Sequence, residues 1–590
     1  MNPMTSRARN MPRVSMDRLT MVAAALLASG SGFGPQVLVA QDAPRPRTVP
    51  AGVNSSPLPL KHEPRPTSAA ITTQDLMTRL YIVADDSLGG RDVGTEGHFK
   101  ATEYLAAEAK RMGLKPAGEN GTFFQELKIG VRRVDPMATF VAGGISLALN
   151  REWAVASRVD LSFDNVPVIF GGDLGNVAID SAQAVGKLVA LRVPRSNQAI
   201  TQVAFGPVPT PAGASGVVLL LPNGAAGVLS FVNRPDLKSL DPTPGTSYLV
   251  VSDSAATKLF PTSIAALAPG AEGARVTVTA PLQITAPRFP VRNVVALLEG
   301  SDPVLKHQYV AVGAHSDHVG TVPRGVDHDS ILVFNRIVRP GGAEDERNLG
   351  TPEQFAQINA ELVELRKTKP ARRDSIFNGA DDDGSGTVAV QEVAEYLASL
   401  TTKPKRSTLF VWHAGEEKGL WGSAYFTEHP TVPRDSIVAQ LNVDMVGRGS
   451  ATDVTGATAT GEPLRGGPDY LQLVGSRRLS TALGDLVERV NKDRKHNFVF
   501  DYAMDANGHP MNIYCRSDHY EYAKWGIPVT FFTTGGHSAY HQLTDEPQYI
   551  DYPHMQRVTR LIADIALELG NGARPKVDGV RLDPRGSCKQ

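Results

Sequence analysis

Five short runs of the sequence carry the side chains that metal chemistry uses. Each follows a predicted strand or opens a predicted helix, and the runs are His315–His318, Asp381–Gly386, Gly415–Glu417, Asp444 and Tyr540-His541. Any one of them alone is more typical of a turn or a helix cap. Together, two histidines and three carboxylates suit two zinc-like ions, provided that one carboxylate bridges them. Such a centre would activate a water molecule.

The elements that must position these runs indicate an α/β fold. Compact apolar stretches predict buried strands at Asn293–Leu298, Tyr309–Ala314, Leu409–His413, Ile437–Asp444 and Pro528–Phe532. Helical periodicity predicts helices at about Thr387–Leu400 and around Val558–Leu569. The alternation favours a mixed, mainly parallel sheet flanked by helices. Because ligands gather at the carboxyl ends of parallel strands, the five runs are expected to meet there.

A calcium loop is the alternative interpretation of the Asp-rich run. Asp381-x-Asp383-x-Ser385-Gly386-x₅-Glu392 fits the spacing of an EF-hand loop. The preceding segment is a poor entering helix, because Asn378-Gly379 lies just ahead of the first ligand. A calcium loop would also leave the other runs unexplained, so the two-ion centre is favoured.

Composition excludes several other classes of protein. The 590 residues carry 60 Lys+Arg against 61 Asp+Glu, and a formal net charge of −1 gives no general attraction to nucleic acid. The chain has only two cysteines, Cys515 and Cys588, which rules out a cysteine-rich zinc module. It has no His-Glu-x-x-His zincin helix and no Gly-x-Ser-x-Gly nucleophile motif. Any metal must therefore be held by histidines and carboxylates.

The same runs resemble a known family, the di-zinc exopeptidases of the bacterial leucyl aminopeptidase and glutamate carboxypeptidase type. The resemblance covers about residues 70–570, and its motifs are Gly313–Asp317, Gly379–Gly386, Gly415–Ser423, Asn442–Met445 and Tyr540-His541. It implies a zinc-exopeptidase fold and a metal-dependent enzyme that acts on peptides, in the first place an aminopeptidase. The alternatives are a carboxypeptidase, a single-zinc glutaminyl cyclase-like acyltransferase and a non-enzymatic, receptor-like relative.

The resemblance assigns the metal ligands residue by residue. It implies that Asp382 bridges the two ions, that His315 and Asp444 complete one site, and that Glu417 and His541 complete the other. Zinc is the expected metal, although cobalt or manganese would be accepted by the same donors.

Three catalytic roles are also implied by the resemblance. Glu416 would be the general base that takes a proton from water and passes it to the leaving amine. Asp317 would hold the His315 ring, and Tyr540 would stabilise the oxyanion. The family usually has a much shorter connection between its first two ligand motifs. The inserted residues 321–377 are irregular in pattern, and we expect either a functional lid or a disordered excursion.

The chain is expected to divide into domains around this centre. Residues 71–134 and 286–570 would form the peptidase domain, and residues 571–590 a C-terminal tail. Between the two peptidase segments, short Val/Leu-rich stretches separated by Pro, Gly and Asn predict an inserted β-rich domain at 135–285, which resembles a protease-associated domain.

The N-terminal region is typical of an exported protein. Residues 1–40 combine a basic start with a short apolar stretch, as in a cleaved signal peptide, and a Pro-rich linker follows at residues 41–70. We expect a periplasmic or secreted protein without a membrane span, while the oligomeric state is left open.

Overall fold

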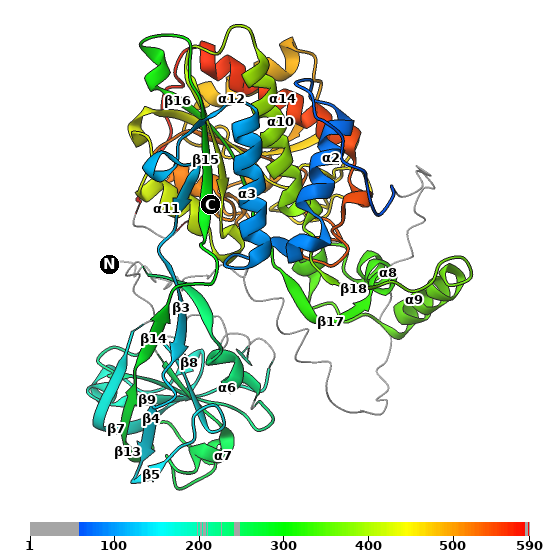
Figure 1. The fold of residues 1–590 in the computed structure, drawn as a ribbon. Coiled ribbons are helices and arrows are strands. Elements are labelled where there is room, and N and C mark those ends of the chain that lie inside the picture. The colour runs from blue at the N-terminus through cyan, green and yellow to red at the C-terminus, as the bar shows by residue number, and fades with distance from the viewer. Residues whose placement is uncertain are drawn as a thin grey trace, which may run out of the picture. The chain divides into compact units, whose positions relative to one another are not determined.

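The computed structural model describes residues 58–590, apart from residues 158, 197–198, 201–202, 204–207, 209, 226, 241–247, 585–587 and 589. The chain forms two compact units (Figure 1). One unit is Lys128–Pro287, and the other combines the described residues before Lys128 with Arg288–Gln590. The second unit contains every predicted site residue. The predicted signal, residues 1–40, and much of the predicted linker lie outside the described residues.

The site-bearing unit is built on a nine-stranded mixed sheet, so the predicted fold class is confirmed. In spatial order its strands are β1 (Lys115–Pro116), β15 (Arg292–Leu298), β19 (Ser407–His413), β16 (Tyr309–His315), β20 (Ile437–Val443), β23 (Val529–Thr533), β21 (Tyr470–Val474) and β22 (Val499–Asp501), with β2 (Phe124–Glu126) also paired with β15. The central strands β19, β16, β20 and β23 are parallel to one another. Their carboxyl ends therefore lie along one edge of the sheet.

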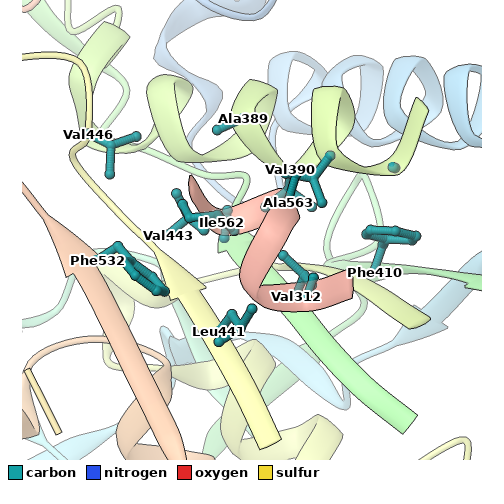
Figure 2. Packing of buried hydrophobic residues seen from close by; sticks show 14 of the residues in the cluster. Val312, Ala389, Val390, Phe410, Leu441, Val443, Val446, Phe532, Ile562 and Ala563 are labelled. Carbon is teal, nitrogen blue, oxygen red and sulfur yellow. The ribbon is translucent and has the colours of Figure 1, made fainter. Parts of the chain in front are cut away.

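Helices cover both faces of this sheet. The first face packs with α2 (Thr73–Val83), α3 (Glu96–Arg111), α10 (Gly386–Ser399), α12 (Thr481–Asp493) and α14 (Tyr552–Asn571), and the second with α11 (Trp421–Glu428) and α13 (His519–Ala523). Along β16, Val312 belongs to the first core and its neighbour Ala311 to the second. Figure 2 shows Val390 of α10 and Ile562 of α14 in the first core. Burial on both faces fixes the strand register, because a slip would expose apolar side chains.

The inserted residues 321–377 form regular helices and strands, so the expected disordered excursion is wrong, while a role as a lid stays a prediction. They form β17 (Thr321–Asp327), α8 (His328–Val338), η5 (Gly342–Asp345), α9 (Pro352–Leu365) and β18 (Arg373–Ile376), and β17 pairs with β18. Helix α9 begins with a capping box between Thr351 and Gln354 and has Pro352 in its first turn. These local signals were present in the sequence but were outweighed by the charged composition of the segment. Figure 1 shows α8 and α9 side by side.

The unit Lys128–Pro287 contains a second nine-stranded sheet. Its spatial order is β5 (Ile145–Ser146), β4 (Thr139–Ala142), β13 (Glu272–Ala280), β7 (Leu161–Asp173), β9 (Leu188–Arg192), β10 (Gly216–Leu220), β12 (Tyr248–Val251) and β6 (Trp153–Ala156), with β8 (Asn176–Val177) paired with β7. Three short helices connect its strands along the chain: α4 (Ser181–Ala184) follows β8, α6 (Gly227–Val232) follows β10 and α7 (Asp253–Ala256) follows β12. The unit begins earlier than residue 135, because β3 (Ile129–Val134) pairs with β11 (Asp236–Ser239) and β14 (Leu282–Thr285).

The C-terminal residues contact the site-bearing unit. Cys588 forms a disulfide with Cys515, and the side-chain oxygen of Gln590 accepts a hydrogen bond from the Tyr514 backbone N–H at 3.0 Å. The sequence did not predict this disulfide, because two cysteines 73 residues apart carry no pairing signal. Within the part of the chain that the structure describes, no helix combines the length and apolar character needed to cross a bilayer.

Candidate metal centre

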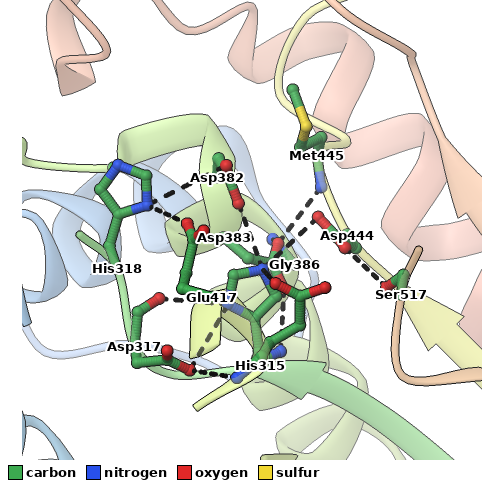
Figure 3. Close-up of polar contacts among 12 residues, drawn as sticks. His315, Asp317, His318, Asp382, Asp383, Gly386, Glu417, Asp444, Met445 and Ser517 are labelled. Atoms are coloured by element: carbon green, nitrogen blue, oxygen red, sulfur yellow. Dashed lines mark hydrogen bonds and ion pairs between the residues drawn. The ribbon is translucent and has the colours of Figure 1, made fainter. Parts of the chain in front are cut away.

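The five predicted ligands meet at the carboxyl edge of the central strands, with Asp382 between two groups of donors. Figure 3 shows four of them, His315, Asp382, Glu417 and Asp444. Asp382 Oδ1 lies 3.1 Å from His315 Nε2, and its Oδ2 lies 2.8 Å from His541 Nε2. Asp444 Oδ1 is 3.7 Å from His315 Nε2, and Glu417 Oε2 is 3.0 Å from His541 Nε2. Asp382 therefore faces both groups of donors.

These donors fit divalent cations. Asp382 Oδ2 and Glu417 Oε1 are buried, and no described residue offers either atom a hydrogen bond of acceptable geometry, although histidine nitrogens lie close. Lone pairs of nitrogen and oxygen that converge in this way are accounted for by an ion between them, since imidazole and carboxylate are zinc ligands.

The electrostatics of the cluster keep the carboxylates of Asp382 and Glu417 ionised. Burial disfavours the charged form of Asp382, but His541 and His315 hold its carboxyl pKa well below the usual range. Burial likewise raises the pKa of Glu417, and His541 reverses this and lowers it to about 2. Both groups are therefore in the form that metal coordination requires.

The backbone around Asp382 and His541 is constrained, by hydrogen bonds at Asp382 and by a left-handed conformation at His541. Asp545 Oδ2 accepts the backbone N–H groups of Asp381 and Asp382, both at 3.0 Å, just before α10 begins. His541 has a φ of 53°, in the left-handed region that few residues other than glycine adopt. Backbone strain of this kind concentrates at functional sites.

Arg91 ties two ligand-bearing loops together. This buried guanidinium, at the end of η1 (Asp86–Arg91), donates to the carbonyl oxygens of Ser316 at 3.1 Å and Gly379 at 2.9 Å. No role for Arg91 was predicted from the sequence. Its only signal is the surrounding Gly-rich run, which by itself is typical of a turn.

Ser517 positions Asp444. Its hydroxyl donates to Asp444 Oδ2 at 2.7 Å and accepts from Asn442 Nδ2 at 2.8 Å. Asp444 Oδ1 is thereby left facing His315 (Figure 3). Sequence reasoning gave Ser517 no role, because serine before a helix usually acts as a cap.

The EF-hand alternative is wrong, because its ligands have other partners. Asp383 Oδ2 accepts the His315 backbone N–H at 3.0 Å, and Asp383 Oδ1 accepts that of Gly386 at 2.9 Å. Glu392, which would close the calcium loop, forms an ion pair with Arg79 at 2.6 Å.

Glu416 and Glu417 diverge at the start of η7 (Glu416–Lys418). Glu417 faces His541, whereas Glu416 Oε2 lies 4.0 Å from His315 Nε2 and the side chain lines the open cleft. Burial raises the pKa of Glu416 well above its ordinary value, Glu417 and Asp444 add to this, and His315 opposes it. A carboxyl with a raised pKa beside the donor cluster is suited to accepting and returning a proton.

Asp317 makes contacts different from those implied by the resemblance. His315 Nδ1 lies 3.1 Å from the backbone carbonyl oxygen of Asp317 but 3.8 Å from its carboxylate. The Asp317 carboxylate instead accepts the N–H groups of Gly415 at 2.7 Å and Glu416 at 3.1 Å. The carbonyl thus orients the His315 ring, and the carboxylate holds the turn that presents Glu416.

A cleft of about 1590 Å³ opens over the cluster, and Tyr540 is part of its wall. The Tyr540 ring stacks on His541 with centroids 4.0 Å apart, and its hydroxyl lies 3.4 Å from Arg516 Nη2. One part of the cleft is apolar and includes Val454, Leu464, Met504, Met511, Ile513 and Phe531. Another part comes from the insertion and includes Arg336, Ile337, Glu344, Asp345, Gln354 and Gln357.

A histidine that the sequence analysis left without a role lies inside the donor cluster. His318 is fully buried, and its Nδ1 is 2.8 Å from Glu417 Oε1 and 4.0 Å from Asp382 Oδ2. The available signal was its position three residues after His315, at the exit of the same strand.

Comparison with known proteins agrees with this geometry. Residues 293–566 match the model of peptidase family M28. This part of the chain is an M28 peptidase domain. The M28 domain contains all the predicted ligands, so the resemblance seen in the sequence is confirmed.

Curated relatives of the chain are named leucine aminopeptidase 1. Those of Sclerotinia sclerotiorum and Aspergillus oryzae are 29% and 31% identical over 202 and 203 residues, which is 32% of this chain and 46% of each relative. The chain thus spans about half the length of the curated relatives it matches.

Similar solved structures include two bacterial enzymes. An aminopeptidase from Aneurinibacillus sp. strain AM-1 matches with a TM-score of 0.44 and 14% identity, over 87% of this chain and 97% of that one. A zinc aminopeptidase from Bacillus subtilis matches with a TM-score of 0.43 and 15% identity, over 88% and 100% of the two chains.

Proposed function

We propose that the protein is a metal-dependent aminopeptidase that removes N-terminal residues from peptides at a two-ion site. The observation that carries this is the position of Asp382 between two donor groups, with the non-coordinating carboxyl of Glu416 beside them. A purely structural metal site has no need of a free carboxyl at its edge. The M28 match and the names of the relatives support the same reaction.

His315, Asp382 and Asp444 would hold one ion, and Asp382, Glu417 and His541 the other. Zinc fits this donor set, and cobalt or manganese would also be accepted. When bound, such cations supply Lewis-acid activation of water and of the scissile carbonyl.

The protein side chains would handle the protons and the developing charge. Glu416 takes a proton from the attacking water and delivers it to the amine that leaves. Burial raises the pKa of the Tyr540 hydroxyl well above its usual value, so this group remains a donor for the oxyanion.

The cleft also supports peptides as substrates. Its volume of about 1590 Å³ exceeds the roughly 300–1,000 Å³ of a pocket for a small ligand. An aminopeptidase binds one residue before the scissile bond, for which the apolar part of the cleft is suited. The rest of the substrate would then continue past the insertion, whose polar side chains can pair with peptide N–H and C=O groups.

A substrate panel tests the proposal directly. We expect the purified protein to release the N-terminal residue from leucyl anilides and from peptides with a blocked C-terminus, and to lose activity after chelation. Release from peptides with a blocked N-terminus would instead indicate the carboxypeptidase alternative. Cyclisation of N-terminal glutamine at one bound ion per chain would indicate the cyclase alternative.

Export to an oxidising compartment is part of the same proposal. It is supported by the basic and apolar N-terminal sequence and by the Cys515–Cys588 disulfide. N-terminal sequencing of protein from the native cells checks it, and an intracellular product that retains Met1 would contradict it.

A further inference from the structure

His318 has the contacts of a metal ligand, although the family motifs in the sequence assigned it no ligand role. Its Nδ1 lies 2.8 Å from Glu417 Oε1, and its ring meets that of His541 at a centroid distance of 5.5 Å. Figure 3 shows the ring directed at Glu417 and Asp382. His318 therefore shares its nearest polar neighbours with His541.

The geometry of these contacts is not that of hydrogen bonding. Both ring nitrogens of His318, Oε1 of Glu417 and Oδ2 of Asp382 are buried, and none has a hydrogen-bond partner of acceptable angle among the described residues. One donor atom from each of His318, Asp382, Glu417 and His541 lies within 4.8 Å of the other three. Zinc ligands at about 2.0–2.2 Å from one ion are separated by similar distances. A cation at their centre would satisfy all four atoms.

The surrounding backbone is shaped to admit the His318 ring. Gly379 has a φ of 56°, and a Cβ on it would lie 2.5 Å from His318 Cγ, closer than atoms can approach. The backbone N–H of His318 donates to the carbonyl oxygen of Arg91 at 3.2 Å. Since Arg91 also holds the carbonyl of Gly379, one buried residue fixes the backbone on both sides of the ring.

We propose that His318 is a protein ligand of the site formed by Asp382, Glu417 and His541. This inference rests on the proposed two-ion site and extends it. The site would then have four protein donors, whereas the site of His315, Asp382 and Asp444 would have three.

The difference in donor number assigns unequal roles to the two sites. Sites with four protein ligands are typically closed, and sites with three keep a position open for water or substrate. The closed site would bind its ion more tightly and act mainly through its charge. The open site, beside Glu416, would be the one that binds the substrate carbonyl.

Metal binding by matched variants tests the assignment. Metal-free wild-type, His318→Ala and His554→Ala proteins would be titrated with zinc against a chelating indicator. His554 is the control, because it is buried in the same unit but bonds the carbonyl oxygen of Tyr470 at 2.8 Å, outside the donor cluster. Loss of groups that only support a ligand costs about 10–100-fold in affinity. We expect His318→Ala to lose about 100-fold or more at the tighter site and His554→Ala to retain wild-type affinity there.

A spectroscopic measurement on the wild-type protein keeps the proposal testable if His318→Ala does not fold. X-ray absorption of protein loaded with one equivalent of zinc should show two imidazoles on the ion, and His318→Gln should show one. One imidazole in the wild-type protein, or near-wild-type affinity in His318→Ala, would overturn the assignment. A wild-type protein that binds no zinc at all would instead contradict the proposed function.

Discussion

The protein contains two nine-stranded sheets. Each has parallel, buried strands at its centre, but the residues at the strand ends differ. In the unit Lys128–Pro287, the parallel strands β9 and β10 lead into Val193-Pro194 and Leu221-Pro222. In the other unit, β16, β19 and β20 lead into His315, Glu417 and Asp444. Among the described residues, the His/Asp/Glu groups suited to a metal all lie between His315 and Glu546.

This difference shows that the sheet supplies rigidity and the exit residues supply chemistry. Both sheets have strands with no solvent-exposed face, so both can hold their ends in fixed positions. Only one has donors at those positions. A similar architecture therefore does not imply a similar function.

Removal of Asp382, the donor that the two proposed ion sites share, is expected to have the largest effect. Asp382→Asn takes a negative charge from between two sites, so we expect the metal content to fall from near two ions per chain and activity to be lost. Asp180→Asn, at a helix cap of the other unit, is the control and should leave both unchanged. Elemental analysis after dialysis and turnover of a leucyl anilide measure the outcome. Full metal content and activity in Asp382→Asn would contradict the two-ion assignment.

Glu416→Gln separates chemistry from metal binding. The amide keeps the size of the side chain but cannot take a proton, so turnover should fall by roughly 10²–10⁴-fold while the metal content stays at the wild-type value. The same preparation is assayed for bound metal and for turnover. Near-normal turnover would show that Glu416 is not the base.

Ser517→Ala examines a contact that only the folded chain creates. Without the hydroxyl, Asp444 loses the donor that orients it, and the affinity of one metal site should fall about 10–100-fold. Ser252→Ala removes a helix cap in the other unit and is the matched control. A titration with zinc distinguishes the two variants. Equal affinities in both would mean that Ser517 has no part in holding Asp444.

Gln357→Trp asks whether the insertion contacts long substrates. Gln357 lines the cleft, and a large ring there should obstruct a peptide that passes over α9. We expect kcat/KM for a hexapeptide to fall at least tenfold, about 1.4 kcal/mol, with little change for a leucyl anilide. Asn359→Trp is the control, since this exposed residue of the same helix does not line the cleft. Equal losses of kcat/KM for the two substrates would show that the peptide does not pass over α9.

A matched pair of glycines, one in each unit, is expected to give the smallest effects. Gly342 and Gly144 have φ values of 59° and 84°, but a Cβ on Gly342 would lie 2.6 Å from the carbonyl oxygen of Tyr540, whereas a Cβ on Gly144 meets nothing within 4 Å. Gly144→Ala should lower the unfolding free energy by about 1–2 kcal/mol, from backbone strain alone. Gly342→Ala should cost more and also lower activity, because Tyr540 precedes His541. Denaturant unfolding and kinetics report both effects, and identical behaviour of the two variants would show that η5 does not support the site.

The fold class and the five runs of candidate ligands were predictable from the sequence alone. Strands buried on both faces have continuous apolar sequences, which can be recognised without a structure. Parallel strands bring their carboxyl ends to one edge of the sheet whatever the length of the connections. Local patterns also contained the helices of the insertion, although its charged surface concealed them.

The residues that surround those runs became apparent only in the folded chain. His318, Arg91 and Ser517 are common residue types whose local spacing predicts caps, turns or ordinary loop positions. They act through contacts with residues far away in the chain, such as Arg91 with Gly379 and Ser517 with Asp444. Such contacts depend on which loops the sheet order places side by side, and a distance of a few ångströms between loops is fixed by packing, not by any local sequence pattern.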